Sequence, residues 1–217
     1  MAYGESLARL NPCSPQRIKL LLDPLLSRGE YLIDIGCGRG ATLAWFAQHS
    51  TFVLYGAEPD AALYALARQN CPEANLTHAK ADKLPFEDAA FDIAIMECVF
   101  SLLENPKAAA AEASRILRRG AVFLLSDLYA LSGENLFFEQ SSLLRNVYAK
   151  TRIEDYITES GFLPYSFTDC TQDMRSMAAQ MILDGALDTD SGLADKESLK
   201  QLRRAKAGYG IWIFLRR

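Results

Sequence analysis

A glycine-rich turn is the strongest local pattern in the sequence, and its residues are suited to binding a ligand. Asp34 is followed at alternate positions by Gly36, Gly38 and Gly40, after an apolar run that begins at Tyr31. Glycine lets the backbone turn tightly and approach a ligand, and the start of a following helix offers free amides to a polar group. The pattern therefore predicts a site for a small polar ligand between residues 34 and 40.

Two classes of ligand fit this turn. Gly36, Gly38 and Ala41 satisfy the dinucleotide pattern G-x-G-x-x-G/A, which would indicate an NAD(P)-dependent oxidoreductase. Asp34 favours a different ligand, because a carboxylate two residues before the first glycine repels a pyrophosphate and attracts an ammonium group. We therefore favour a ligand that carries an amino-acid moiety.

Glu58 supplies a second carboxylate, 18 residues after Gly40 and at the end of the second apolar run. At that place a carboxylate can accept hydrogen bonds from both hydroxyls of a ribose. A dinucleotide and an amino-acid nucleoside both contain a ribose. Glu58 therefore indicates an adenosine-type ligand without separating the two classes.

The segments that must position these carboxylates alternate between strand and helix. Apolar runs of strand length lie at 31–35, 52–57, 76–79, 91–96 and 121–126. Segments with helical periodicity lie at 41–49, 60–70 and 107–118. Strands that alternate with helices, several of them as continuous apolar runs, are typical of a parallel sheet covered on both faces. The sequence predicts an α/β fold.

The two ends of the chain add elements to this alternation. Ser14 and Pro15 suit the first positions of a helix, which we place within residues 1–29. Segment 128–150 fits no strand of the sheet, and 173–207 is typical of two consecutive helices, so we interpret both as insertions on the substrate side. A final strand at 209–215 completes a single domain of residues 1–217.

Apolar side chains recur in both insertions. Met174, Met177 and Met181 follow helical spacing, and Phe137 and Phe138 lie in the first insertion. The methionines either form one helix face packed on the core or, with the aromatic residues, line a pocket for an apolar or aromatic small molecule. The second interpretation requires Phe137 and Met177 to lie near the end of the fourth strand.

The composition argues against several classes of protein. The chain has 217 residues, of which 50% are hydrophobic and 23% charged, and its formal net charge is −4. The mild acidity argues against a nucleic-acid-binding protein. The longest apolar runs are far shorter than the ~20 residues of a membrane span, and the first residues lack a signal-peptide pattern, so we expect a cytoplasmic protein. The residues leave its oligomeric state open.

The cysteines and histidines form no metal-binding motif. The five cysteines are scattered along the chain without a CxxC pair, and only two histidines accompany them. A structural zinc site needs about four such ligands at characteristic spacing. We therefore expect no metal site.

Five motifs, taken in order, resemble those of a known enzyme family. They are the glycine turn at 34–40, the triplet 58–60, the loop 81–86, the pair 91–92 and the segment 111–120. Together they resemble the class I S-adenosylmethionine-dependent methyltransferases, in the branch that includes quinone-biosynthesis enzymes (methyltransferase type 11), over residues 30–127. The resemblance implies a Rossmann-like, seven-stranded, mostly parallel sheet with an antiparallel terminal strand and helices on both faces. It also implies S-adenosylmethionine as cofactor and methyl transfer to a small-molecule substrate by in-line displacement.

The resemblance assigns most of the cofactor-binding residues. Asp34 would hold the methionine ammonium, and the backbone from Gly36 to Gly38 would pass beneath the cofactor. Glu58 would hold the ribose. The remaining positions of this implied site are Cys37, Pro59 and Met96.

The adenine would be recognised in the loop before the fourth strand. Asp82, together with the backbone of Ala81, would accept a hydrogen bond from the adenine amine. Many members of the family carry this acid two places earlier, where the present chain has Lys80. Asp82 is therefore the less typical of the implied acids.

The side of the site that would face the methyl acceptor follows the fourth strand. The resembling branch often carries histidines there, at positions where this chain has Ser101 and Leu102. The usual general base is therefore missing. Glu97 is the remaining candidate for accepting a proton, and a purely structural role is its alternative.

Cys98 is the second catalytic candidate. The run from Glu97 to Leu102 is similar to a stretch of arsenite methyltransferases in which the matching cysteine binds the metalloid. Those enzymes use further cysteines, and this chain has none between Cys98 and Cys170. A packing role is the alternative, because cysteine is among the most commonly buried residue types. The same motifs are also compatible with a non-catalytic S-adenosylmethionine-binding module.

Overall fold

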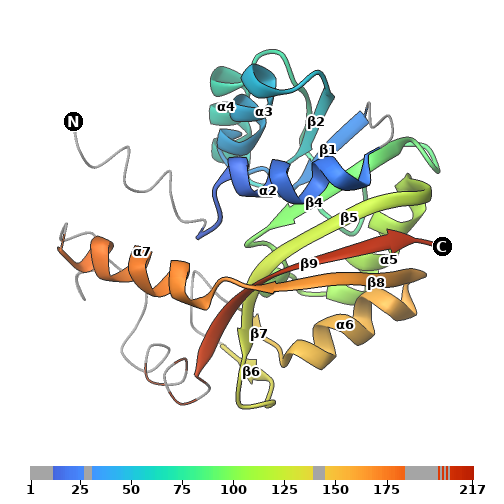
Figure 1. Cartoon of the computed structure of the whole chain (residues 1–217). Helices are drawn as coiled ribbons and strands as arrows, with labels where there is room; N and C mark the ends of the chain where they lie inside the picture. The colour runs from blue at the N-terminus through green and yellow to red at the C-terminus, as the bar shows by residue number, and fades with distance from the viewer. Residues whose placement is uncertain are drawn as a thin grey trace.

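Seven strands form one sheet in the order β3-β2-β1-β4-β5-β9-β8 (Figure 1). The computed structural model describes residues 12–26, 31–138, 145–183, 200, 202, 204 and 206–217. The strands are β1 (Tyr31–Ile35), β2 (Val53–Ala57), β3 (Asn75–Thr77), β4 (Phe91–Glu97), β5 (Leu117–Ala130), β8 (Phe162–Asp169) and β9 (Ala207–Arg216). Neighbours pair in parallel except at β9, which is antiparallel to both β5 and β8. The predicted α/β fold is confirmed.

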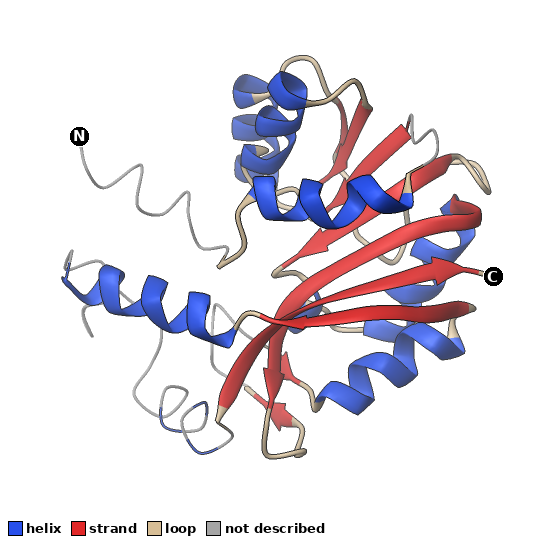
Figure 2. Cartoon of the chain, in the orientation of Figure 1, coloured by secondary structure: helices blue, strands red, loops and turns tan. Residues whose placement is uncertain are grey.

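Helices cover both faces of the sheet, as expected (Figure 2). The core clusters place α2 (Pro15–Leu22), α3 (Ala41–His49) and α4 (Ala61–Asn70) on one face. They place α5 (Pro106–Ile116) and α6 (Lys150–Glu159) on the other, and α7 (Thr171–Leu183) extends outward from the end of β8. Among the described helices, none has both the length and the apolar character that crossing a membrane requires.

Local signals determine where two of these helices begin. Ser14 Oγ accepts a hydrogen bond from the amide of Arg17 at 3.3 Å. Asp60 Oδ1 accepts hydrogen bonds from the amides of Ala62 and Leu63, both at 2.9 Å. Such caps satisfy amides that have no partner within their own helix. They set the start of α2 and the start of α4, the helix that follows β2.

The core consists of two layers, one on each face of the sheet. Successive strand residues point to opposite faces, so Ile33 and Ile35 join the layer beneath α5 and α6, whereas Leu32 joins the layer beneath α2, α3 and α4. Strands buried on both faces need apolar residues at every position. This explains the continuous apolar runs in the sequence.

Two boundaries differ from those expected. α2 ends at Leu22 and is followed by a 3-10 turn, η1 (Asp23–Leu25), because Pro24 has no amide hydrogen to continue the hydrogen bonding of the helix. β5 continues to Ala130 because it pairs with β9 along its last part, so residues 128–130 belong to the sheet and not to an insertion. The expected helix end at Gly29 and most of the helix expected at 196–207 lie outside the described residues.

The first insertion forms a small hairpin outside the main sheet. Its strands are β6 (Leu136–Phe137) and β7 (Asn146–Val147), which pair only with each other among the described strands. The segment therefore occupies no place in the seven-stranded sheet, as its sequence indicates.

Asp127 ties the end of β5 to the turn that follows β4. Its buried carboxylate accepts hydrogen bonds from the amide of Ser101 at 2.8 Å and from the amide of Leu128 at 2.7 Å. Ser101 lies in the 3-10 turn η2 (Phe100–Leu102). Burial raises the pKa of Asp127 to about 6, although the hydrogen bonds oppose this change.

The substitution Asp127→Asn should remove a pH dependence of stability that the wild type shows between about pH 4 and pH 6. The folded-state pKa of about 6 exceeds the ordinary value of 3.8, so ionisation costs stability in the folded protein. The favourable contribution of protonated Asp127 to the free energy of unfolding is therefore fully present below pH 3.8 and is lost as the pH rises through about 6. The difference between the two pKa values corresponds to about 3 kcal/mol in the free energy of unfolding.

Urea denaturation across this pH range measures the effect. The free energy of unfolding of the wild type, relative to that of Asp127→Asn, should rise as the pH falls. Asp155→Asn removes an exposed carboxylate on α6 and serves as the control, for which the pH profile should follow the wild type. Parallel profiles for wild type and Asp127→Asn would show that Asp127 titrates normally.

Candidate active site

Three carboxylates meet where the parallel strands β1, β2 and β4 end. Asp34 lies near the end of β1 and pairs with Gly56 of β2 and Ile95 of β4. Glu58 directly follows β2, and Glu97 is the last residue of β4. Burial, then repulsion from Glu97 and from Glu58, raises the pKa of Asp34 well above its ordinary value. The structure therefore brings the three predicted acids into one site.

The Asp34 carboxylate is suited to a cationic group of a ligand. Its residue is 2% exposed, and no hydrogen bond or ion pair to this carboxylate is found within the described residues. A buried charge without a partner is costly. Two nearby acids increase that cost, and they would repel a pyrophosphate while attracting an ammonium. These residues fit the amino-acid end of S-adenosylmethionine better than a dinucleotide phosphate.

The glycine turn between β1 and α3 is closely packed on one side and open on the other. Gly36, Gly38 and Gly40 have left-handed backbone, with φ of 80°, 54° and 76°, a conformation that glycine adopts readily. A Cβ atom at Gly36 would collide with Val99. A Cβ atom at Gly38 would meet no atom within 4 Å. Gly36 thus permits close packing beneath the turn, and Gly38 leaves the backbone accessible.

Glu58 is hydrogen-bonded to this turn. Its Oε2 atom accepts from the amide of Gly38 and its Oε1 atom accepts from the amide of Asp60, both at 2.9 Å. Each carboxylate oxygen can accept a further hydrogen bond. Ribose hydroxyls can therefore bind Glu58 without displacing the two amides that orient it.

The other residues predicted to bind the cofactor differ in how exposed they are. Cys37 and Met96 are buried, and their side chains belong to the two core layers, so their backbones are better placed for a ligand than their side chains. Pro59 and Asp82 are exposed, whereas Ala81 is buried. The adenine-binding role of Asp82 stays a prediction.

The chain turns sharply after β4, at Cys98. Its backbone is left-handed, with φ of 54°, although the residue is not glycine. Its amide donates to the carbonyl of Ser126 at 2.8 Å, and its sulfur lies 3.2 Å from the hydroxyl oxygen of Tyr209. Burial and then the charge of Asp127 raise the pKa of the Cys98 thiol. A thiol that stays protonated is a poor nucleophile and a poor ligand, so the geometry favours the packing role.

Cys13 and Cys170 are far apart in the sequence but adjacent in the structure. Their thiols lie close enough to affect one another's pKa, and both side chains are buried. Burial raises the pKa of Cys13 to about 12. Among the described residues, no group of three His, Cys, Asp or Glu side chains is arranged to hold a metal ion. The two thiols pack the N-terminal segment against the start of α7, where Arg17 also forms an ion pair with Asp173.

Sequence reasoning missed three residues that shape this site. Tyr209 and Ser126 support Cys98, and Asp127 holds the turn η2. Ser126 and Asp127 follow an apolar run, which is the usual signal of a strand end that faces a ligand. Tyr209 has no such signal, because its strand was expected only to close the sheet.

The hairpin of the first insertion lies against the turn that follows β4. The amide of Arg145 donates to the carbonyl of Ser101 at 2.9 Å. The ring of Tyr148 contacts Phe100, with centroids 6.1 Å apart, and contacts Phe137 at 6.2 Å. Phe137 is 63% exposed. The insertion therefore lies beside the turn that follows β4, the strand that ends at Glu97.

The methionines of the predicted series lie on α7, and the first of them packs on the core. Met174 packs against the core layer that contains α2, α3 and α4. Met177 is half-buried on α7, and the side chain of Met181 lies outside the described residues. The packing of Met174 agrees with the interpretation of this series as a helix face on the core.

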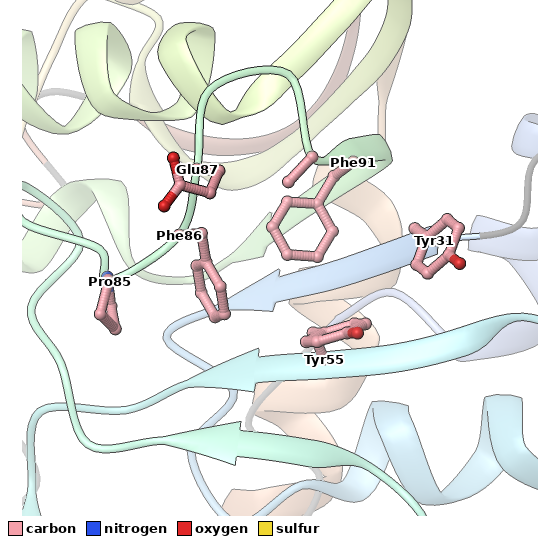
Figure 3. A pocket seen from close by; sticks show the side chains of 7 residues that line it. Tyr31, Tyr55, Pro85, Phe86, Glu87 and Phe91 are labelled. Carbon is pink, nitrogen blue, oxygen red and sulfur yellow. The ribbon is translucent and has the colours of Figure 1, made fainter.

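A hollow lies toward the end of the sheet opposite to the carboxylates (Figure 3). Its volume is about 350 Å³, and it is lined mainly by aromatic side chains, namely those of Tyr31, Tyr55, Phe86 and Phe91, with Pro85, Glu87 and Ala90. Tyr31 and Phe91 are the first residues of β1 and β4, whereas the carboxylates lie where these strands end. Residues 78–90, all of them described, contain no helix that would cover this face. The hollow is separate from the carboxylate site.

Comparison with known proteins agrees with the geometry of the carboxylate site. Residues 33–125 match the family described as "Methyltransferase domain". An O-methyltransferase of Pyrenophora dematioidea is 24% identical over 170 residues, which cover 71% of this chain and 62% of that protein. The chain spans less than two thirds of the length of the first curated relatives that it matches.

Solved structures share the fold at low sequence identity. Geranyl diphosphate C-methyltransferase from Streptomyces coelicolor A3(2) has a TM-score of 0.76 and 15% identity, over 93% of this chain and 77% of that chain. The cyclase SpnF has a TM-score of 0.68 and 20% identity, over 93% and 82%. The family match contains the glycine turn and the three carboxylates. Residues 33–125 of the chain therefore match the methyltransferase domain family, on a fold that the chain shares with solved methyltransferases.

Proposed function

We propose that the chain transfers a methyl group from S-adenosylmethionine to a small-molecule acceptor by in-line displacement. The observation that carries this proposal is the cluster of Asp34, Glu58 and Glu97 beside an accessible glycine turn. These acids repel the negative charge of a pyrophosphate and attract an ammonium group. They can also accept hydrogen bonds from ribose hydroxyls. The match of residues 33–125 to the methyltransferase domain family supports the same ligand.

The residues of the chain hold different parts of this ligand. Asp34 pairs with the ammonium, Glu58 accepts the ribose hydroxyls and Asp82 accepts the adenine amine. The supporting positions are Gly36, Cys37, Gly38, Pro59, Ala81 and Met96. When bound, S-adenosylmethionine supplies an electrophilic methyl group on a positively charged sulfur.

Glu97 is the proposed proton acceptor. It ends β4 close enough to Asp34 to raise the pKa of that carboxyl group. The acceptor atom loses its proton when it gains a methyl group, and a carboxylate at this strand end can receive that proton. Cys98 is proposed to contribute packing, because its thiol stays protonated and contacts Tyr209.

The acceptor is proposed to be a small, largely apolar molecule with a nucleophilic oxygen or carbon atom. Phe100, Tyr148 and Phe137 form a chain of ring contacts from η2 to the hairpin, and aromatic side chains favour an apolar ligand. One similar protein is named an O-methyltransferase and another a geranyl diphosphate C-methyltransferase. The formal charge of −4 argues against a nucleic-acid substrate.

A cytoplasmic location is part of the proposal. Cys13 and Cys170 lie close enough to affect one another's pKa, and no disulfide joins them. Adjacent thiols persist in a reducing compartment, whereas an oxidising one favours disulfides.

Two alternatives differ from this proposal in measurable ways. An NAD(P)-dependent oxidoreductase would place a pyrophosphate beside Asp34, which the neighbouring acids disfavour. A module that binds S-adenosylmethionine without turnover would have the same cofactor site. The fold alone does not distinguish a methyltransferase from a protein with another function, because a protein named as a cyclase, SpnF, has the same fold.

Titration calorimetry with S-adenosylhomocysteine and with NADH tests the identity of the ligand. We expect micromolar binding of S-adenosylhomocysteine and no binding of NADH, because the carboxylates select against a pyrophosphate. Binding of NADH without binding of the sulfur nucleoside would overturn the proposal.

Transfer of a labelled methyl group separates an enzyme from a binding module. Incubation with a panel of small apolar alcohols, phenols and activated carbon acids should label at least one acceptor. Glu97→Gln should lower that rate by about 100-fold, because the amide cannot receive the proton, and should change the Kd for S-adenosylhomocysteine by less than about threefold. Tight binding without transfer to any acceptor would favour the binding module.

Asp34→Asn should weaken ligand binding and stabilise the fold at the same time. An amide cannot pair with the ammonium, so the affinity for S-adenosylhomocysteine should fall about 10- to 100-fold. The substitution also removes a buried charge that Glu97 and Glu58 repel, so the free energy of unfolding at neutral pH should rise. This gain should shrink as the pH falls, because protonation removes the same charge from the wild type.

Calorimetry and urea denaturation measure the two effects. Glu87→Gln removes an acid at the opposite end of the sheet and should leave the affinity unchanged. If Asp34→Asn binds as tightly as the wild type, the ammonium lies elsewhere.

A further inference from the structure

The turn after β4 needs support, because its conformation is unfavourable for the residue that adopts it. Cys98 has a φ of 54°, in a region that residues other than glycine seldom occupy. Such backbone strain persists only where the surrounding structure imposes it. Glu97 precedes Cys98 and Val99 follows it. The positions of both neighbours therefore depend on what holds Cys98.

Tyr209 of β9 supplies support through its hydroxyl group. The hydroxyl oxygen lies 3.2 Å from the Cys98 sulfur, and the hydroxyl donates a hydrogen bond to Ser126 Oγ at 3.0 Å. The carbonyl oxygen of Ser126 accepts a hydrogen bond from the amide of Cys98. Tyr209 is 1% exposed and Ser126 is 0% exposed. Water is therefore kept away from these contacts, which strengthens them.

The backbone of Tyr209 is itself fixed on both sides. Its amide donates to Thr171 Oγ1 at 3.2 Å, and its carbonyl accepts the amide of Cys170 at 2.7 Å. Tyr209 also pairs with Leu128 of β5 in the sheet. The hydroxyl is therefore presented to Cys98 from a rigid position.

The turn contacts the ligand site at two places. Val99 packs directly on Gly36, where a Cβ atom would collide with its Cγ2 atom. Glu97 is one of the two acids that repel Asp34. A change in the backbone at Cys98 would therefore alter the glycine turn and the carboxylate cluster together.

We propose that Tyr209 is a positioning residue of the S-adenosylmethionine site. Its hydroxyl holds Cys98 in the left-handed conformation, and this sets Glu97 and Val99 against the glycine turn. The identity of the ligand rests on the proposed function. The support of the turn rests on the geometry of Tyr209, Ser126 and Cys98 alone.

Tyr209→Phe removes the hydroxyl and keeps the buried ring. We expect the affinity for S-adenosylhomocysteine, measured by calorimetry, to fall about tenfold. Cys98→Gly should bind within about threefold of the wild type, because glycine adopts the left-handed conformation without support. For the same reason, the double variant should recover the affinity that Tyr209→Phe loses. A hydroxyl with a merely structural role would give no such rescue.

Hydrogen exchange of the ligand-free proteins tests the positioning role independently of the ligand. In Tyr209→Phe the amides of residues 36–38 and 97–101 should exchange faster than in the wild type. Tyr55→Phe is the control, because it removes the hydroxyl group of a half-buried tyrosine that lines the hollow at the opposite end of the sheet. It should change neither exchange in these segments nor affinity.

The outcomes separate this inference from the proposed function. If the wild type binds S-adenosylhomocysteine and Tyr209→Phe binds it equally well, the inference is overturned. It is also overturned if the double variant stays as weak as Tyr209→Phe. If the wild type does not bind S-adenosylhomocysteine, the proposed function fails. In that case, unchanged exchange at 97–101 in Tyr209→Phe overturns the support of the turn as well, and faster exchange supports it.

Discussion

The close approach of three carboxylates, of which Asp34 and Glu58 are buried and Glu97 is half-buried, is the constraint on which the rest of the site depends. Like charges in a buried site disfavour ionisation and destabilise the folded state, as the raised pKa of Asp34 shows. Parallel strands that are buried on both faces hold the acids together, because their carboxyl ends meet at one edge of the sheet. The amides of Gly38 and Asp60 offset part of the cost at Glu58. Binding of a cationic group would relieve the remainder.

The second half of the sheet supports the same site by a different means. β1, β2 and β4 supply the charges, whereas β5 and β9 hold the turn that follows β4. Asp127 at the end of β5 accepts the amide of Ser101, and Tyr209 of β9 contacts Cys98. The antiparallel strand therefore does more than close the sheet. It carries a buried hydroxyl to the strand end where the acids meet.

Sequence reasoning succeeded where the signals are local. The glycine turn, the first two apolar runs and the spacing of Asp34 from Glu58 lie within residues 31–58, so periodicity and turn chemistry were enough to predict them. The contact of Tyr209 with Cys98 and that of Cys13 with Cys170 join distant segments, and they depend on a strand order that periodicity does not encode. The extension of β5 to Ala130 has the same origin, because its partner is β9. The binding and catalytic roles of Asp34, Glu58, Asp82 and Glu97 stay predictions.

The attachment of the β6–β7 hairpin has a consequence for how proteins of this architecture can diversify. The hairpin is joined to the turn after β4 through the Ser101 carbonyl and the ring of Phe100, whereas Glu58 is oriented by Gly38 and Asp60 in the first third of the chain. The two parts of the site therefore have separate sources of rigidity. Under the proposed function, substitutions in the hairpin would alter which acceptor is admitted while the strands that carry Asp34 and Glu58 retain their geometry. This separation makes the hairpin a natural segment to exchange when a new acceptor specificity is evolved or engineered.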